Sequence, residues 1–376
     1  MSKQGRIYYL DVARAIAIIS ITFNHAVNRT FNIYSGTISE YQTIPVLVTV
    51  LKSVLYIFSR IGVPFFLMIT GALLLYRDYS GGYGKFLKKN WMQLLVTTEI
   101  WLTIMFWYLQ LSPASVLRTE GLAVCLLRFV MTLLFIDPVT MGSMWYMPMI
   151  LCVYLMIPIF SAALKSIPSK AFILPIAVVV LSDFLLPDLN LALSGIGMKY
   201  QLSTTLEAVN VFSMYAVYML LGHFISQGLL DRMSRRGLLF SGLAAFLAAA
   251  LFQFWLYSRV DGAVVAYEYM SLLLLVSSVF LFGYVKVSIK PERDNKLVVT
   301  LADISFGIYF VHICIMEGLT EVLDHFSLHS YFVRFALLEG VSFLGAVLII
   351  QILRRNAWAA KNLFGIKRLG NKAGQA

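Results

Sequence analysis

The chain has 376 residues, of which 60% are hydrophobic and only 13% are charged, and its formal net charge is +11 at pH 7. Soluble globular proteins are about half apolar and about a quarter charged, so this composition excludes an ordinary soluble domain. The basic residues gather in short patches between apolar runs, as in the cytoplasmic loops of membrane proteins, and no basic-aromatic motif of a nucleic-acid-binding protein accompanies them. The three cysteines have no CxxC spacing and predict neither a disulfide nor a metal site.

Apolar runs of about 20 residues, the length that an α-helix needs to cross a bilayer, recur along the chain. They predict an all-α, polytopic transmembrane bundle with spans at 8–28, 46–76, 91–111, 143–164, 171–187, 207–226, 237–257, 268–286, 297–316 and 332–353. The run 46–76 is longer than one span requires and contains Pro64, which predicts a broken helix. We expect one membrane domain, 1–353, followed by a basic cytoplasmic tail, 354–376.

A further apolar run, 122–136, is short for a bilayer crossing and has Arg128 in its middle. If this run crossed, the basic loops after it would lie on the opposite side from those before it. If it lies on the external side instead, as an interfacial or re-entrant segment, the basic segments share one face, as the positive-inside rule requires. The sequence therefore predicts about ten spans, both termini in the cytoplasm, and a multi-pass protein of the inner (cytoplasmic) membrane.

The first apolar run, LDVARAIAIISITFNHAV, contains three ionisable side chains: Asp11, Arg14 and His25. At 100° per residue they fall within about 60° of one another around the helix and form one polar stripe. Asp11 and Arg14 have the i, i+3 spacing of an ion pair, and His25 lies about 16 Å farther along the helix. Ionisable groups inside a membrane are functional-site candidates; the plainer interpretation is a structural ion pair and a hydrogen-bonding histidine at the outer boundary.

Other spans carry polar groups at a comparable depth. His312 lies about 22 Å into the span 297–316, which places it, like His25, in the outer half of the bilayer. Arg60 is expected at mid-to-outer depth in the second span and Trp145 near the outer start of the fourth, so the four residues form a candidate outer cluster. No HExxH, Walker A, GxSxG or GxGxxG motif occurs in a workable context, and the sequence predicts no metal site.

Four segments, taken in chain order, carry a distinctive pattern. YYLDVARAIAIISITFNH places Arg14 ten intervening residues before His25, and RIGVPFFLMITGALLL follows it. MWYMPMILCVYLMIPIF begins beside Trp145, and ISFGIYFVHI contains Tyr309 and ends next to His312. In content and order these segments resemble the motifs of the acyltransferase-3 family of integral membrane O-acyltransferases.

The resemblance implies an enzyme that moves an acyl group, most often acetyl, from cytoplasmic acyl-CoA to a hydroxyl of a cell-envelope carbohydrate or glycolipid. It implies no permanently bound cofactor, because acetyl-CoA or another acyl-CoA is the donor substrate. The remaining expected partners are the saccharide acceptor and membrane lipid, and nucleic acid is not among them.

The resemblance also implies roles for the candidate residues. It implies that Arg14 and His25 are the catalytic residues and that Asp11 takes part in binding the donor or the acceptor. The phosphates of CoA would lie at a basic inner mouth, near Arg14 or near Lys85, Lys88 and Lys89. Neutral His25 would act as general base on the acceptor hydroxyl, although a covalent acyl-histidine route is also open. The residues expected to stabilise the oxyanion or to orient the sugar are Arg60, Trp145, Tyr309 and His312.

A secondary transporter or flippase for an envelope precursor is the main alternative. Buried acids, arginines and histidines can form a proton relay, and a broken helix suits a binding site at the middle of the bilayer. Inverted repeats would favour this alternative, and the sequence shows none.

Overall fold

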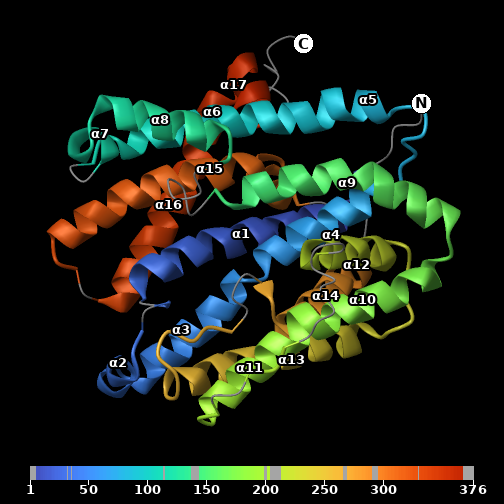
Figure 1. The fold of residues 1–376 in the computed structure, drawn as a ribbon, viewed down its shortest axis with the longest axis horizontal. Helices are drawn as coiled ribbons and strands as arrows, with labels where there is room; N and C mark the ends of the chain where they lie inside the picture. Colours follow the sequence, from blue (N-terminus) through green and yellow to red (C-terminus); the bar gives the residue numbers. More distant parts are fainter. Residues whose placement is uncertain are drawn as a thin grey trace. The chain divides into compact units, whose positions relative to one another are not determined.

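The computed structural model describes residues 6–31, 33–34, 36–112, 115–136, 144–198, 201–203, 213–265, 269–289, 295–328 and 330–366. All regular structure in these ranges is helical, which confirms the all-α prediction. The elements are α1 Tyr8–Thr30, α2 Ile38–Thr43, α3 Val46–Ser59, α4 Gly62–Leu74, α5 Tyr83–Phe86, η1 Leu87–Trp91, α6 Met92–Leu109, α7 Val116–Thr119, α8 Leu122–Leu133, α9 Tyr146–Ser166, η3 Ser169–Phe172, α10 Ile173–Val179, η4 Val180–Leu185, α11 Leu186–Gly195, α12 Met214–Ser226, α13 Arg235–Tyr257, α14 Leu272–Ser288, α15 Lys296–His325, α16 Tyr331–Leu353 and α17 Ala357–Asn362 (Figure 1).

Eight helices in the described part of the chain are long and apolar enough to cross a membrane. They correspond to eight of the predicted spans, with α3 and α4, α5 to α6, and η3 to α11 each counted as one helix. The spans predicted at 207–226 and 268–286 contain the shorter helices α12 and α14, of 13 and 17 residues. Residues 207–212 lie outside the described residues, so the start of the first of these spans is untested. The run 122–136 forms α8, whose 12 residues reach about 18 Å, short of the roughly 30 Å hydrocarbon core.

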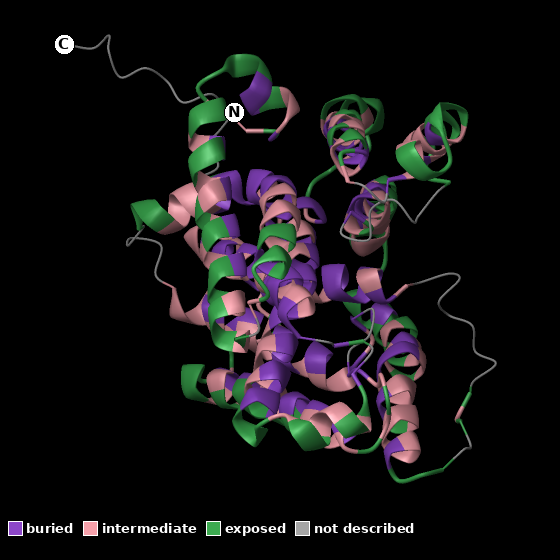
Figure 2. Ribbon diagram, turned by 90° about the vertical axis from the view of Figure 1, so that its left-hand side faces the viewer, coloured by how far each residue is buried: buried purple, intermediate pink, exposed green. Residues whose placement is uncertain are grey.

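The chain divides into two compact units, and each is considered by itself. The first unit comprises Met1–Arg77, Ala163–Ser305 and Ser327–Glu339, and the second comprises Asp78–Ala162, Phe306–Phe326 and Gly340–Ala376. Along individual helices, buried and exposed residues fall on different faces (Figure 2). This is the pattern of helices that pack on one side and leave apolar side chains such as Phe240 and Leu251 exposed on the other.

In the first unit, α4 packs against α1 and α12 (Figure 1). Two glycines permit the contact between α4 and α12. A Cβ atom on Gly71 would lie 1.8 Å from the Met219 carbonyl oxygen, and one on Gly222 would lie 2.2 Å from the Met68 carbonyl oxygen. The two backbones can therefore approach this closely only where side chains are absent, as is common between membrane helices.

The helix predicted to break near Pro64 does break, between α3 and α4. α3 ends just before Arg60, and α4 begins just after Ile61. Pro64 lies in the first turn of α4, where a backbone N–H would have no partner within the helix, so the missing N–H of proline costs nothing there. Ser20 of α1 lies against the break: its Oγ donates to the Phe58 carbonyl and accepts from the Gly62 N–H, both at 2.8 Å. One hydroxyl thus satisfies two backbone groups that the break exposes inside the membrane.

The second unit is held by aromatic contacts between α6, α15 and α17. The Trp101 ring stacks on Phe310 with centroids 5.0 Å apart, and its Nε1 donates to the Leu363 carbonyl at 2.7 Å. Tyr108 Oη donates to the Cys314 carbonyl at 2.9 Å. These contacts pack the face of α15 that carries Phe310 and Cys314 against α6.

Candidate active site

A cavity of about 310 Å³ lies at the start of α1, within the first unit. Its lining combines charged side chains with apolar and aromatic ones: Arg6, Asp11, Arg14, Arg77 and Asp303, with Ile7, Leu10, Leu73 and Tyr76. Three arginines against two aspartates give this lining a formal charge of 3 − 2 = +1. Arginine binds phosphate through several fixed N–H donors, so the cavity is suited to a phosphate-bearing ligand.

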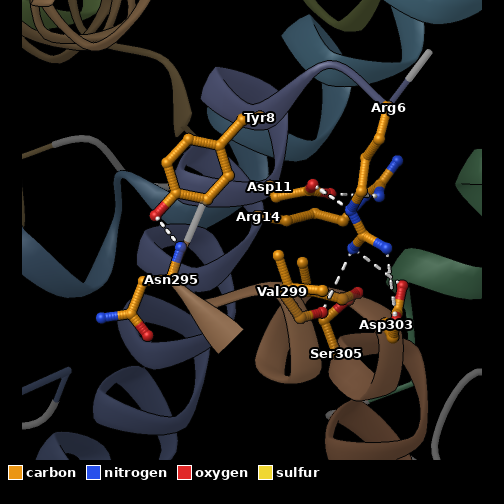
Figure 3. Close-up of polar contacts among 9 residues, drawn as sticks. Arg6, Tyr8, Asp11, Arg14, Asn295, Val299, Asp303 and Ser305 are labelled. Carbon is orange, nitrogen blue, oxygen red and sulfur yellow. Dashed lines mark hydrogen bonds and ion pairs between the residues drawn. The ribbon is translucent and has the colours of Figure 1, made fainter. Parts of the chain in front are cut away.

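Arg6 is the centre of the charged contacts at this cavity (Figure 3). Its Nε donates to Asp11, and its Nη2 donates to Asp303 Oδ1 at 2.9 Å and to the Val299 carbonyl at 3.2 Å. Asp11 also pairs with Arg14, whose Nη1 lies 3.5 Å from Asp11 Oδ1, which confirms the pair predicted from the i, i+3 spacing. The hydrogen bond to Asp11 raises the pKa of Arg6, so the bond reinforces the charge on the guanidinium.

Burial differs between the two ends of the Asp11–Arg14 pair. The Asp11 side chain is 4% exposed and the Arg14 side chain 29% exposed. A buried carboxylate is costly unless it is paired, and Asp11 meets this condition with two guanidinium groups. Arg14 keeps part of its surface open at the cavity, where a ligand can reach it.

The polar stripe continues along α1 into the interior of the first unit. Thr22 is fully buried and His25 is 8% exposed. Thr22 Oγ1 donates to Glu339 Oε1 of α16 at 2.7 Å. His25 lies about 16 Å beyond Arg14 along the helix axis. The predicted stripe is therefore a buried polar face of α1, with the cavity at its N-terminal end.

Arg60 lies at the break between α3 and α4 and is buried among three tyrosines. Its Nε and Nη2 donate to Tyr56 Oη at 3.2 and 3.1 Å, and Nη2 also donates to Tyr34. The guanidinium lies over the rings of Tyr56 and Tyr269, 5.0 and 5.1 Å from their centroids. Hydrogen bonds and cation–π contacts together compensate its burial.

In the second unit, the predicted residues Trp145, Tyr309 and His312 form a row of rings in which Tyr146 lies between Trp145 and Tyr309. Trp145 and Tyr146 have ring centroids 6.1 Å apart, Tyr146 and Tyr309 6.0 Å, and Tyr309 and His312 6.5 Å. His312 is fully buried, and its Nδ1 lies 2.6 Å from the Ile308 carbonyl oxygen, which makes Nδ1 the donor. Trp145 is 38% exposed, so the row runs from a surface ring to a buried imidazole.

The structure thus gathers the predicted residues into two groups. Asp11, Arg14, His25 and Arg60 belong to the first unit, whereas Trp145, Tyr309 and His312 belong to the second. Lys85, Lys88 and Lys89, the other residues expected to meet the donor, are exposed on α5 and η1 of the second unit.

Sequence reasoning missed several residues of the first group. Arg6, Arg77 and Asp303 line the cavity, and Glu339 contacts the stripe through Thr22. Arg6 and Arg77 were interpreted only as basic residues that set the orientation of the spans. Asp303 and Glu339 are acids inside predicted spans, which is the signal that could have singled them out.

Comparisons with known proteins identify one family. The family model described as an acyltransferase domain, that of the acyltransferase-3 family, matches residues 7–351. No curated protein and no solved structure matches the chain. The family match covers most of the chain and includes every residue of the two groups except Arg6. The chain therefore belongs to the acyltransferase-3 family of membrane acyltransferases.

Proposed function

We propose that the protein transfers an acyl group, most often acetyl, from cytoplasmic acyl-CoA to a hydroxyl of a cell-envelope carbohydrate or glycolipid. One observation carries the proposal: Arg14, which lines the cavity, and the buried His25 lie on the same polar face of α1. In this proposal the phosphates of CoA bind Arg14 and the other cavity cations, and the thioester end extends along the stripe. The family match supports the reaction class.

His25 acts as the general base in this reaction. Its ring nitrogen takes the proton of the acceptor hydroxyl while the oxygen attacks the thioester carbonyl and the new C–O bond forms. The C–S bond then breaks, and the CoA thiolate receives the proton from the imidazolium. The products are the acyl ester and free CoA, so the protein is returned to its starting state.

The other predicted residues take supporting roles. Arg60 supplies positive charge that stabilises the oxyanion or orients the acceptor, and Tyr309 and His312 provide hydrogen-bonding groups for the same purposes. Trp145 offers a partly exposed ring against which a sugar can stack. Both termini lie in the cytoplasm in this proposal, and the protein lies in the inner membrane.

The test uses purified protein in nanodiscs, acetyl-CoA labelled in the acetyl group, and a glycolipid extract from envelope membranes. Wild type is compared with His25→Gln and with His223→Gln, a matched control because His223 is also a buried histidine of the first unit, at 9% exposure against 8% for His25. We expect label to reach a carbohydrate with wild type and with the His223 variant, and to fall by at least 100-fold with the His25 variant.

Each other outcome has a defined meaning. Equal transfer by wild type and His25→Gln would remove His25 from the chemistry and direct attention to His312. Absence of transfer by folded wild type, with several acyl-CoA donors and the full acceptor extract, would overturn the proposal. In that case uptake of an envelope precursor into sealed vesicles would test the transporter alternative.

A further inference from the structure

The first turns of α16 pack along the outer half of α1, and all of these residues belong to the first unit. Two ring contacts and one hydrogen bond align the helices: Phe31 with Tyr331 at 5.5 Å, Phe23 with Phe335 at 5.2 Å, and Arg334 Nε donating to the Arg29 carbonyl at 3.1 Å. Along these contacts the residue numbers on α1 fall while those on α16 rise. The two helices therefore run antiparallel here, and the alignment brings Glu339 to the polar stripe.

Glu339 meets the stripe at Thr22. The Thr22 hydroxyl has two acceptors within reach, Glu339 Oε1 at 2.7 Å and the Ile19 carbonyl at 2.9 Å. The shorter contact is to the carboxyl group, which as a carboxylate is the stronger acceptor. Glu339 Oε2 is also buried, and it has no hydrogen-bond partner among the described residues. An isolated buried carboxylate is costly, so a nearby positive charge would lower this cost.

His25 lies one turn beyond Thr22 on the same face of α1. Residues at i and i+3 on a helix have Cβ atoms about 5–6 Å apart. The Thr22 hydroxyl thus holds a carboxyl group beside the turn of α1 that carries His25. The proposed function requires His25 to become positively charged during each turnover, when it takes the proton of the acceptor.

The ionisable side chains around the outer half of α1 are otherwise cationic or neutral. The elements that contact this half of α1 are α3, α4, α14 and α16. The ionisable side chains are Arg29 on α1, Lys52 and Tyr56 on α3, Arg60 at the break after α3, Tyr284 and Lys286 at the end of α14, and Tyr331, Arg334 and Glu339 on α16, whereas α4 carries none. Among these described side chains, Glu339 is the only carboxylic acid, and the tyrosines are neutral near pH 7. Three arginines oppose a positive imidazole in this region, and Glu339 offsets them.

We propose that Glu339 is a positioning residue for His25: its carboxylate, held by Thr22, stabilises the imidazolium that forms when His25 takes the acceptor proton. This inference rests on the proposed function, with His25 as base. Glu339 forms no bond to the substrate and exchanges no proton with it. Its contribution is electrostatic, and it is large because the site is shielded from water.

The experiment measures kcat/KM for acyl transfer against pH with wild type, Glu339→Gln and Glu99→Gln. Glu339→Gln keeps the shape and the contact with Thr22 and removes the charge. Glu99→Gln makes the same chemical change in α6, within the second unit. Because a base acts in its deprotonated form, activity rises with pH through the titration of His25. Loss of the carboxylate favours neutral His25, so the acid limb moves to lower pH, by about one unit, and the plateau falls about 10- to 100-fold.

A purely structural role for Glu339 predicts a different result. Loss of packing alone lowers activity or thermal stability without moving the acid limb. An unmoved acid limb in folded Glu339→Gln would overturn the inference, and so would an equal movement in Glu99→Gln. A complete lack of transfer by wild type would instead overturn the proposed function, so the two failures are distinct.

A second pair of variants keeps the inference testable if Glu339→Gln does not fold. Thr22→Val has nearly the volume of threonine but lacks the hydroxyl, whereas Thr22→Ser keeps the hydroxyl. We expect Thr22→Val to move the acid limb in the same direction as Glu339→Gln and Thr22→Ser to leave it unchanged. Identical profiles for both Thr22 variants would contradict the role given to the hydroxyl in holding Glu339.

Discussion

Ser20 and Gly62 are joined by a hydrogen bond of 2.8 Å from the Gly62 N–H to the serine oxygen. The same oxygen donates its hydrogen to the Phe58 carbonyl, which also accepts from the Ile61 N–H at 3.2 Å, so α1 supplies the partner of the Gly62 N–H and a second partner of the Phe58 carbonyl. Gly62 is required at this point, since a Cβ atom there would lie 2.7 Å from the Ala17 carbonyl oxygen. The break is thus an interaction between two helices rather than a property of one.

Ser20→Ala should destabilise the protein by about 1–2 kcal/mol, because the Gly62 N–H loses its partner inside the membrane and the Phe58 carbonyl loses one of its two hydrogen bonds. The matched control is Ser53→Ala: Ser53 is also buried, but its hydroxyl bonds to the Thr49 carbonyl one turn earlier in its own helix. Thermal unfolding in nanodiscs measures the difference. Equal loss of stability in both variants would contradict the account of the break.

The position of this break shows what sequence alone can and cannot predict. Pro64 and the length of the run correctly predicted a broken helix. The break occurs before Pro64, at Arg60 and Ile61, because Ser20 satisfies the backbone there. The partner lies about 40 residues away in the chain, and neither helix propensity nor periodicity carries that information.

The candidate site also has one part that the sequence predicts and another that only the fold reveals. The Asp11–Arg14 pair and the stripe that includes His25 follow from helix geometry, and the structure confirms the pair and the burial of His25. Arg6 and Asp303 are paired across 297 residues of sequence, a contact that only the fold reveals. Local spacing therefore predicted the part of the site built by one helix, and packing supplied the rest.

Gly71→Ala should prevent normal packing of α4 on α12, because the added Cβ would overlap the Met219 carbonyl oxygen. We expect loss of at least about 3 kcal/mol or failure to accumulate in the membrane. Gly340→Ala is the control, since a Cβ atom on this glycine of α16 meets no atom within 4 Å. Expression level and detergent-stable yield compare the two, and normal yield of Gly71→Ala would refute the close contact.

Arg60→Lys should lower stability by about 1–3 kcal/mol even though the charge is kept. Lysine cannot reproduce the planar contacts with Tyr56 and Tyr269 or donate from two nitrogens. Arg259→Lys is the control, because Arg259 is exposed and lies over one ring, that of Trp255, at 6.0 Å. Thermal unfolding again gives the comparison, and a neutral Arg60→Lys would show that charge alone suffices.

Arg77→Gln should raise the KM for acyl-CoA about 10-fold with little change in kcat, because it removes a cation that binds the donor before and during transfer. Rising salt should shrink the difference from wild type, since screening weakens interactions at an accessible cavity. Arg235→Gln, which removes an exposed cation at the start of α13 outside the cavity lining, is the control. Equal KM values for wild type and Arg77→Gln would exclude the cavity as the donor site.

The proposed orientation makes a prediction for each short helix. In a background without Cys125, Cys152 and Cys314, a cysteine at Arg235 should react with a membrane-impermeant maleimide only from the cytoplasmic side. A cysteine at Ser330 should react only from outside. Reversed labelling at Arg235 would show that α12 does not cross, and reversed labelling at Ser330 alone would show the same for α14.

The contact of Arg6 with Asp303 has a consequence for biogenesis. The first span leaves the ribosome early, yet the acid that completes its charged cluster is synthesised 297 residues later. Until α15 has been made, Asp11 is the one acid of this cluster that has been synthesised, and Arg6 and Arg14 both pair with it. The cavity can therefore be completed only late in synthesis, and nascent chains that stop before residue 303 will carry its arginines but not the finished site.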